Sequence, residues 1–176
     1  MRFDALSAAP LIVLLTWAAI EDLRARRIAN WLSFSLLLAG IASAATGSNS
    51  IGVGQSVSGA LAGFSIPFVL FALGALGGGD VKLLAAVGAW VGPLRAVEIF
   101  AASAVVGLII VLVQAGVQGK LSQLFRNSIL LTVNLAHVGD VGLDHVKATG
   151  RDAKSVEKPL PYAVPILLGT LFVLVG

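Results

Sequence analysis

Two aspartates, Asp22 and Asp80, stand at the ends of apolar runs in a chain that carries little charge. Asp80 follows three successive glycines, Gly77 to Gly79, and precedes Val81 and Lys82. An acid in hydrocarbon costs on the order of 2.5 to 3.5 kcal/mol even on the lenient insertion scale, so an acid at a membrane boundary is a functional candidate. Glycines allow a bare loop that another backbone can approach closely. We therefore expect Asp80 to be presented where another molecule can reach it.

Two carboxyl groups within a few ångströms of each other could perform acid–base chemistry on a peptide bond. The two groups cannot easily be ionised at the same time, so the pair holds a shared proton near neutral pH. The ionised member takes a proton from water, and the protonated member donates to the scissile carbonyl. No nucleophilic side chain, metal or cofactor is required. The chain has no cysteine and only two scattered histidines, His137 and His145, which are expected to be polar surface residues.

Each acid also has a structural explanation. Asp22 could pair with Arg26 four residues later. Asp80 could be the N-cap of the next helix, or it could pair with Lys82. Glu21 competes with Asp22 for the same role, and the residues alone do not decide between them.

The composition indicates a polytopic membrane protein. Of the 176 residues, 57% are apolar and 12% are charged, whereas about a quarter of residues are charged in soluble domains. The net charge of +3 does not indicate nucleic-acid binding, because the basic residues lie in loops between apolar runs. The first apolar run is expected to remain as a span, since the positive cluster follows it.

The apolar runs predict an all-α fold with about six transmembrane helices in a single domain, 1–176, in contact with the lipid bilayer. A polar tract at 118–159 separates the last two spans, and residues 121–137 within it could form an amphipathic helix on the membrane. The run after Asp80 is short, so the helix is short or the glycine loop lies in a watered cavity. The expected spans are 4–22, 31–46, 51–76, 80–93, 96–117 and 160–175.

Six spans place the loops alternately on two sides of the membrane. One side receives ten basic residues, and the other receives only Arg2 and Arg95. The positive-inside rule assigns the basic side to the cytoplasm and both termini to the outside. Asp22 and Asp80 would then lie at the same cytoplasmic face, where we expect the active site.

Three segments resemble one known family. The segment from Gly77 to Lys82 resembles the Gly-x-Gly-Asp motif of membrane aspartic proteases, in the form found in the type IV prepilin peptidase family. The segment from Asp22 to Asn30 is similar to that family's first catalytic segment, an Asp followed by an Arg-rich stretch and Ile-Pro-Asn. The stretch from Lys158 to Pro165 is like the Pro-Tyr segment that opens the family's last span. Two separate motifs in the right order make the resemblance specific.

The resemblance implies that Asp22 and Asp80 are catalytic and that Gly77 and Gly79 form the motif backbone. Supporting roles are expected for Arg24, Asn30 and Lys82. The alternative is that Lys82 and the arginines only determine topology.

The implied substrate is a prepilin or pseudopilin, cut at the cytoplasmic face of the bacterial inner membrane between a short basic leader and an apolar helix. Small residues from Gly52 to Gly63 could let that helix dock. The chain departs from the family in having Ala29 where Pro is usual, so the turn could be less rigid. It also lacks the paired Cys-x-x-Cys motifs associated with N-methylation. It therefore resembles the short, peptidase-only branch of tight-adherence (Flp) pilus systems.

Other functions remain open. Other Gly-x-Gly-Asp enzymes, such as preflagellin peptidases or proteases that cut within a span, usually have the first Asp in a Tyr-Asp segment, whereas here Arg24 follows closely. A small proton- or cation-coupled transporter component would be expected to carry charge near mid-span, where these runs have none. A membrane scaffold would tolerate the loss of both acids.

Overall fold

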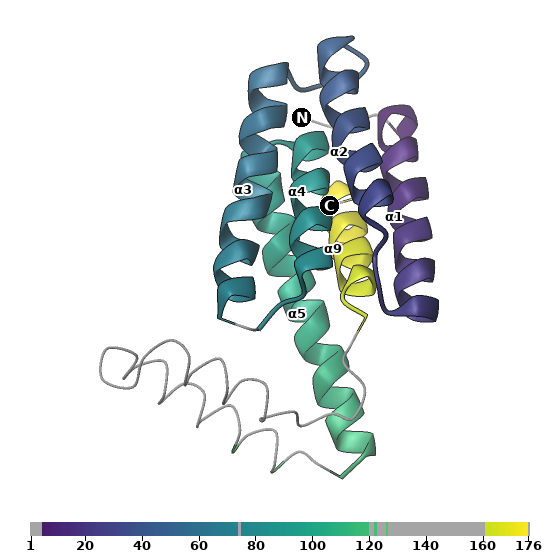
Figure 1. Ribbon diagram of the computed structural model, residues 1–176, viewed down its shortest axis with the longest axis vertical. Coiled ribbons are helices and arrows are strands. Elements are labelled where there is room, and N and C mark those ends of the chain that lie inside the picture. Colours follow the sequence, from purple (N-terminus) through teal and green to yellow (C-terminus); the bar gives the residue numbers. More distant parts are fainter. Residues whose placement is uncertain (1–4, 74, 120–121, 123–125, 127–160, 176) are drawn as a thin grey trace, which may run out of the picture.

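The computed structural model describes residues 5–73, 75–119, 122, 126 and 161–175. Within these ranges the chain is helical and contains no strand, which confirms the all-α prediction (Figure 1). Most of the polar tract, including the amphipathic helix expected at 121–137 and both histidines, lies outside the described residues. The helices are α1 (Ala5–Ala25), α2 (Asn30–Ala45), α3 (Val53–Ala72), α4 (Gly78–Val91), α5 (Pro93–Val117) and α9 (Ala163–Val175).

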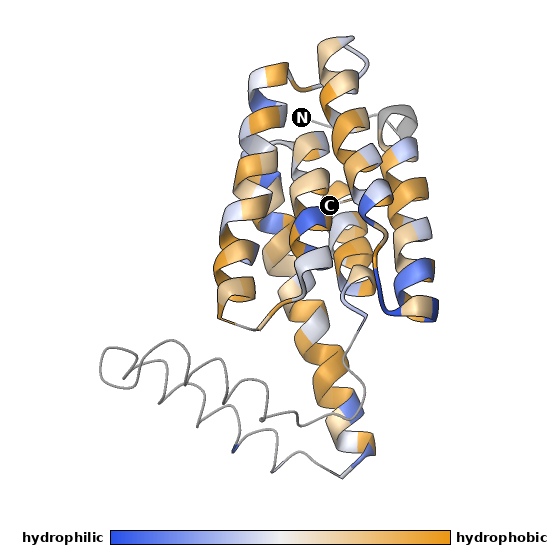
Figure 2. Ribbon diagram, in the orientation of Figure 1, coloured by the Kyte–Doolittle hydropathy of each residue, from blue (hydrophilic) through white to orange (hydrophobic). Residues whose placement is uncertain are grey.

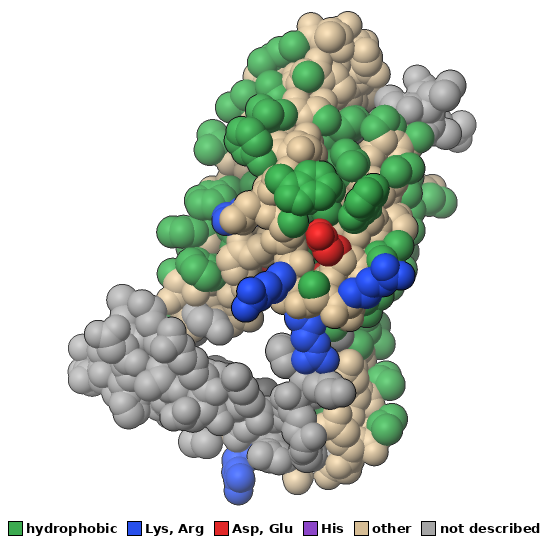
Figure 3. Space-filling model, turned by 45° about the vertical axis from the view of Figure 1, so that its right-hand side comes forward, with side chains coloured by type: hydrophobic (Ala, Val, Ile, Leu, Met, Phe, Trp, Pro, Cys, Tyr) green, Lys and Arg blue, Asp and Glu red, His purple; other side chains and the backbone are tan. Residues whose placement is uncertain are grey.

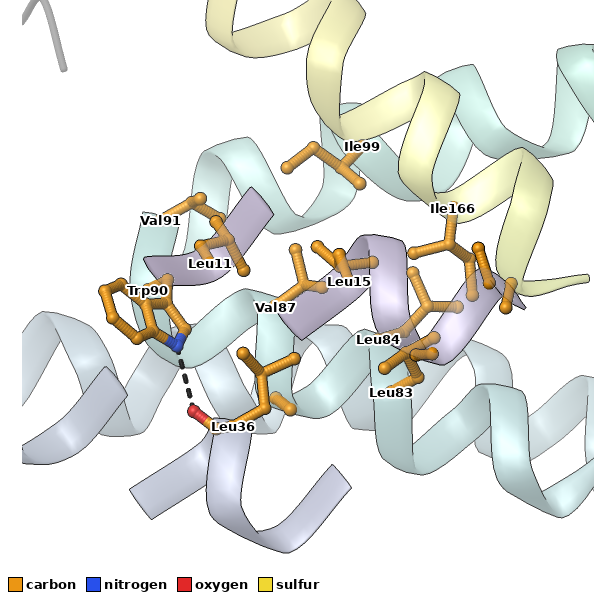
Figure 4. Close-up of a cluster of buried hydrophobic side chains, with 14 of the residues drawn as sticks. Leu11, Leu15, Leu36, Leu83, Leu84, Val87, Trp90, Val91, Ile99 and Ile166 are labelled. Atoms are coloured by element: carbon orange, nitrogen blue, oxygen red, sulfur yellow. Dashed lines mark hydrogen bonds between the residues drawn. The ribbon is translucent and has the colours of Figure 1, made fainter. Parts of the chain in front are cut away.

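The short helix α4 is the centre of the bundle. It packs against α2, α3, α5 and α9, and nine of its 14 residues are buried. Buried apolar side chains from α1, α2, α5 and α9 complete the core around it, and Ala62 of α3 packs against its edge (Figure 4). Leu83, Leu84 and Val87 of α4 meet Leu11 and Leu15 of α1, Leu36 of α2, Ile99 of α5 and Ile166 of α9.

Glycines bring α3 unusually close to α4. A Cβ at Gly59 would meet the carbonyl oxygen of Gly88, and one at Gly63 would meet that of Leu84. Small residues therefore serve close helix packing, as expected. However, Gly59 and Gly63 are buried against the protein's own helix. The expectation that the stretch from Gly52 to Gly63 lets a substrate helix dock is therefore wrong at Gly59 and Gly63, because α4 lies against them, whereas a Cβ at Gly52 or Gly54 would meet no other atom within 4 Å.

Polar side chains fix the end of α4 that is remote from Asp80. The last carbonyl groups of a helix lack partners within it. Ser56 Oγ donates to the carbonyl of Ala89 over 2.7 Å, and Asn49 Nδ2 donates to that of Trp90 over 2.8 Å. The indole Nε1 of Trp90 donates to the carbonyl of Leu36 over 2.9 Å (Figure 4). These bonds hold α4 in register with α2 and α3.

The outer surface of the bundle is apolar. Figure 2 shows hydrophobic residues along most of each helix and hydrophilic residues gathered where α1 ends and α2 begins. Large apolar side chains are well exposed, including Val105 at 57% and Phe172 at 75%. In the described part of the chain, α3 and α5 are each long and apolar enough to cross a membrane. These features support a membrane protein, and six spans remain a prediction.

Candidate active site

Asp22 continues the buried face of α1. Leu11, Leu15 and Ala18 are fully buried, at spacings of four and three residues, and Asp22 follows four residues later with 6% of its surface exposed. This spacing places all four on one side of a helix. Glu21 lies on a neighbouring side and is only half-buried. Helical periodicity thus supplies a physical reason to favour Asp22, where the sequence analysis had only the resemblance.

The carboxylate of Asp22 is held by the start of α9. The backbone N–H of Ala163 donates to Asp22 Oδ2 over 3.1 Å. Since the N-terminus of a helix favours negative charge, this position suits an ionised carboxylate. Arg26, the alternative partner considered above, also attracts Asp22 electrostatically. Arg26 ends α1 in a left-handed conformation, with φ of 52°.

Asp80 lies in the first turn of α4. Gly77 is the N-cap, and its carbonyl accepts from the N–H of Asp80 over 3.1 Å. The suggestion that Asp80 itself is the N-cap is therefore wrong. The Asp80 carboxylate instead turns back to accept a hydrogen bond from the backbone N–H of Gly77, as acidic side chains at the third helical position do in a capping box. This bond fixes the direction of the half-buried carboxylate.

Side chains lie against each of the three glycines before Asp80, most closely at Gly77. Gly77 has φ of −80°, which any residue can adopt. A Cβ at Gly77 would lie 2.8 Å from Asp80 Oδ2, one at Gly78 would lie 3.3 Å from the Phe71 ring, and one at Gly79 would lie 3.4 Å from Ile28. The expected bare loop is present, but its role is close packing. Gly79 places α4 against the linker between α1 and α2.

The fold brings the two predicted catalytic acids together. The carboxylates of Asp22 and Asp80 lie close enough to repel each other electrostatically. Tyr162, which precedes α9, also lies within electrostatic range of Asp80. The acids come from α1 and α4, and the start of α9 completes the group. Two neighbouring carboxyl groups that are partly shielded from water can divide acid and base roles between them.

Lys82 and Asn30 join the two motif segments. Lys82 Nζ donates to Asn30 Oδ1 over 2.9 Å, between the second turn of α4 and the first residue of α2. Arg24 differs from them, because it is exposed on α1 and lines a surface hollow with Trp17 and Ile20. Of the three expected supporting residues, the structure brings Lys82 and Asn30 together and places Arg24 elsewhere.

Charged side chains surround this end of the bundle. Figure 3 shows an acidic side chain between hydrophobic side chains and several Lys and Arg side chains. Glu21 Oε2 is buried and has no hydrogen-bond partner among the described residues. In the same residues, no group of three or more His, Asp or Glu side chains is placed to hold a metal ion. Asp22 and Asp80 are the acids that the fold brings together.

Sequence reasoning did not assign Tyr162 and Ala163 to the site. Both lie far along the chain from the acids, since Ala163 and Asp22 differ by 141 in sequence and Tyr162 and Asp80 by 82. One signal could have found them, namely the likeness of the stretch from Lys158 to Pro165 to the segment that opens the family's last span. That segment places Tyr162 and Ala163 beside the acids.

Comparison with known proteins supports the same family. The model of the type IV leader peptidase family matches residues 9–112, which is more than half of the chain and includes Asp22, Asn30, Asp80 and Lys82. No curated protein and no solved structure was found to match. On this match, the chain belongs to the type IV leader peptidase family.

Proposed function

We propose that this protein is a membrane aspartic endopeptidase that removes the short basic leader of type IV or Flp prepilins at the cytoplasmic face of the inner membrane. Asp22 and Asp80 would be its catalytic residues. The ionised acid would take a proton from a water molecule, and the resulting hydroxide would attack the scissile carbonyl. The protonated acid would donate to the carbonyl oxygen and stabilise the tetrahedral intermediate.

The proximity of Asp22 and Asp80 is the observation that carries this proposal. The two acids stand 58 positions apart, on different helices, yet they share one end of the bundle. Their surroundings differ, because Asp22 accepts from the N-terminus of α9 while Asp80 accepts from Gly77. The helix N-terminus favours a negative charge on Asp22. Asp80 also lies at a helix N-terminus, that of α4, so this effect does not divide the roles of base and proton donor between the two acids.

Family membership supports leader peptidase chemistry in general. The Flp substrate and the absence of methyltransferase activity are proposed from the sequence. The chain has no cysteine, so it cannot carry paired Cys-x-x-Cys motifs. We expect a trimmed pilin with an unmethylated N-terminus, which intact-mass measurement of the product would reveal.

Co-expression with a candidate prepilin tests the proposal. Wild type should shorten the prepilin, and Asp22→Asn and Asp80→Asn should each slow that step by a factor of about 10² to 10⁴. Cleavage that survives either substitution would remove that acid from the mechanism. A wild-type protein that leaves prepilins intact but moves protons or cations would support the transporter alternative.

Two acids serve as matched controls. Glu98→Gln removes a carboxylate from an exposed position on α5, near the opposite end of the bundle. Glu21→Gln removes the acid next to Asp22 without touching the bond to Ala163. We expect Glu98→Gln to process prepilin as wild type does. A loss in Glu21→Gln comparable to that in Asp22→Asn would transfer the catalytic role to Glu21.

A further inference from the structure

An apolar groove runs along the bundle from the level of the site. It has a volume of about 560 Å³ and lies where α2 and α3 flank α4. Its walls are mainly apolar, with Phe34 and Leu37 from α2, Phe64 from α3 and Ala85 from α4. Since Gly59 and Gly63 are covered by α4, this groove is a better place for a helix than the small-residue face of α3.

Polar groups gather at the end of the groove that is nearest to the site. Asn30 and Lys82 line it and are bonded to each other. Ser33 also lines it, and the Ser33 side chain is buried, with 4% exposed. Its Oγ has no hydrogen-bond partner among the described residues. A buried hydroxyl without a partner is costly, and its place in the groove wall indicates a ligand that supplies one.

We propose that this groove holds the apolar helix of the substrate, with its first residues at the polar end. The proposal rests on the proposed function. Side chains of one helix face would fill the space between Phe34 and Phe64, as in helix-in-groove recognition. The first turn of the substrate helix, whose N–H and carbonyl groups are not all bonded within it, would meet Ser33 and Lys82.

The level of the groove matches that of the acids. Lys82 is two residues beyond Asp80, so its Cα lies about 3 Å further along α4. A substrate whose apolar helix begins beside Lys82 would have its preceding peptide bonds near the level of Asp80. Side chains two residues apart on a helix point to nearly opposite sides. A peptide that runs from Lys82 to Asp80 must therefore cross the start of α4. About three extended residues cover the roughly 10 Å involved.

Photocrosslinking in vesicles tests the proposal. The full chain, with benzoylphenylalanine in place of Phe34 or Phe64, would be reconstituted in phosphatidylethanolamine and phosphatidylglycerol with a synthetic prepilin segment. Phe172 on α9, which is 75% exposed, is the matched control position. We expect about tenfold more peptide adduct at Phe34 and Phe64 than at Phe172. Equal adducts at all three positions, or lipid adducts alone in the groove, would overturn the proposal.

The same experiment separates this proposal from the proposed function, because adducts form whether or not the peptide is cut. Cutting without groove adducts would refute only the docking, and groove adducts without cutting would refute only the peptidase assignment. A second variant, Ala85→Leu, narrows the groove. It should raise KM roughly tenfold and leave kcat unchanged, while Ala101→Leu on the exposed face of α5 should change neither. An unchanged KM in Ala85→Leu would overturn the proposal.

Discussion

The ammonium group of Lys82 donates a hydrogen bond of 2.9 Å to Oδ1 of Asn30, across 52 positions of sequence. The bond joins the segment that carries Asp80 to the one that follows Asp22. Asn30 is the first residue of α2, so its backbone is fixed by the helix start. Lys82 therefore does more than determine topology, because it ties the two motif segments together.

Removal of either partner should loosen this link. We expect Lys82→Met and Asn30→Ala each to lower the free energy of unfolding by about 1 kcal/mol, the usual net contribution of a hydrogen bond. Because both variants remove the same interaction, the double variant should lose about as much as either one. Denaturation in detergent micelles measures all three. Fully additive losses would mean that the bond contributes nothing.

The hydrogen bond from Ala163 to Asp22 can be removed with little change to the helix. Ala163→Pro deletes the donor N–H, and proline is well tolerated at the first position of a helix. A hydrogen bond to a charged group contributes about 1.5 to 3 kcal/mol, so we expect prepilin cleavage to slow by roughly 10- to 100-fold. Ala163→Gly keeps the N–H and should cleave nearly as wild type does. Equal loss in both variants would indicate a packing defect.

A side chain at position 77 should disturb the site, because the carboxylate of Asp80 lies beside Gly77. In Gly77→Ala the new Cβ would lie 2.8 Å from Asp80 Oδ2 and would displace the carboxylate. We expect cleavage to fall about tenfold, with a change in stability of no more than about 1 kcal/mol. Gly54→Ala, where no atom lies within 4 Å of the new Cβ, is the control and should retain full activity. Full activity in Gly77→Ala would show that the position of Asp80 is not critical.

Ala29 already has the backbone of a proline. Its φ is −62° and its ψ is 132°, at the N-cap of α2, and proline fixes φ near −65°. Ala29→Pro, which restores the residue usual in the family, should stabilise the fold by about 0.4 to 1 kcal/mol by restricting the unfolded chain. Prepilin cleavage should be unchanged. A lower melting temperature would mean that the ring clashes with Ile28 or that the Ala29 N–H has a partner.

The sequence predicted the helices and the two acids because both depend on local patterns. The apolar runs gave an all-helical chain, and the Gly-rich segment marked Asp80. Contacts between residues far apart in the chain could not be predicted from the sequence. No local pattern shows that Ala163 bonds to Asp22, whereas helical periodicity alone places Arg24, two residues further on, on the side of α1 opposite Asp22.

Glycine was the hardest residue to interpret from sequence. Gly63 and Gly79 both suggested accessible backbone, but another part of the chain lies against each of them. Gly63 faces the backbone of Leu84, and Gly79 faces Ile28. A glycine can mark a close contact, as at Gly63, or open space, as at Gly54, and only the fold distinguishes the two.

Because α4 lies at the centre of the bundle, its length need not match the thickness of the bilayer. Its 14 residues measure about 21 Å, whereas hydrocarbon is about 30 Å thick. A helix exposed to lipid on all sides would be destabilised by that difference, but most of α4 is covered by its neighbours. If its anchored end near Trp90 lies close to the outer surface, Asp80 sits several ångströms below the inner one. A peptide bond would then have to enter a recess to reach Asp80, which favours a substrate that is itself held in the membrane.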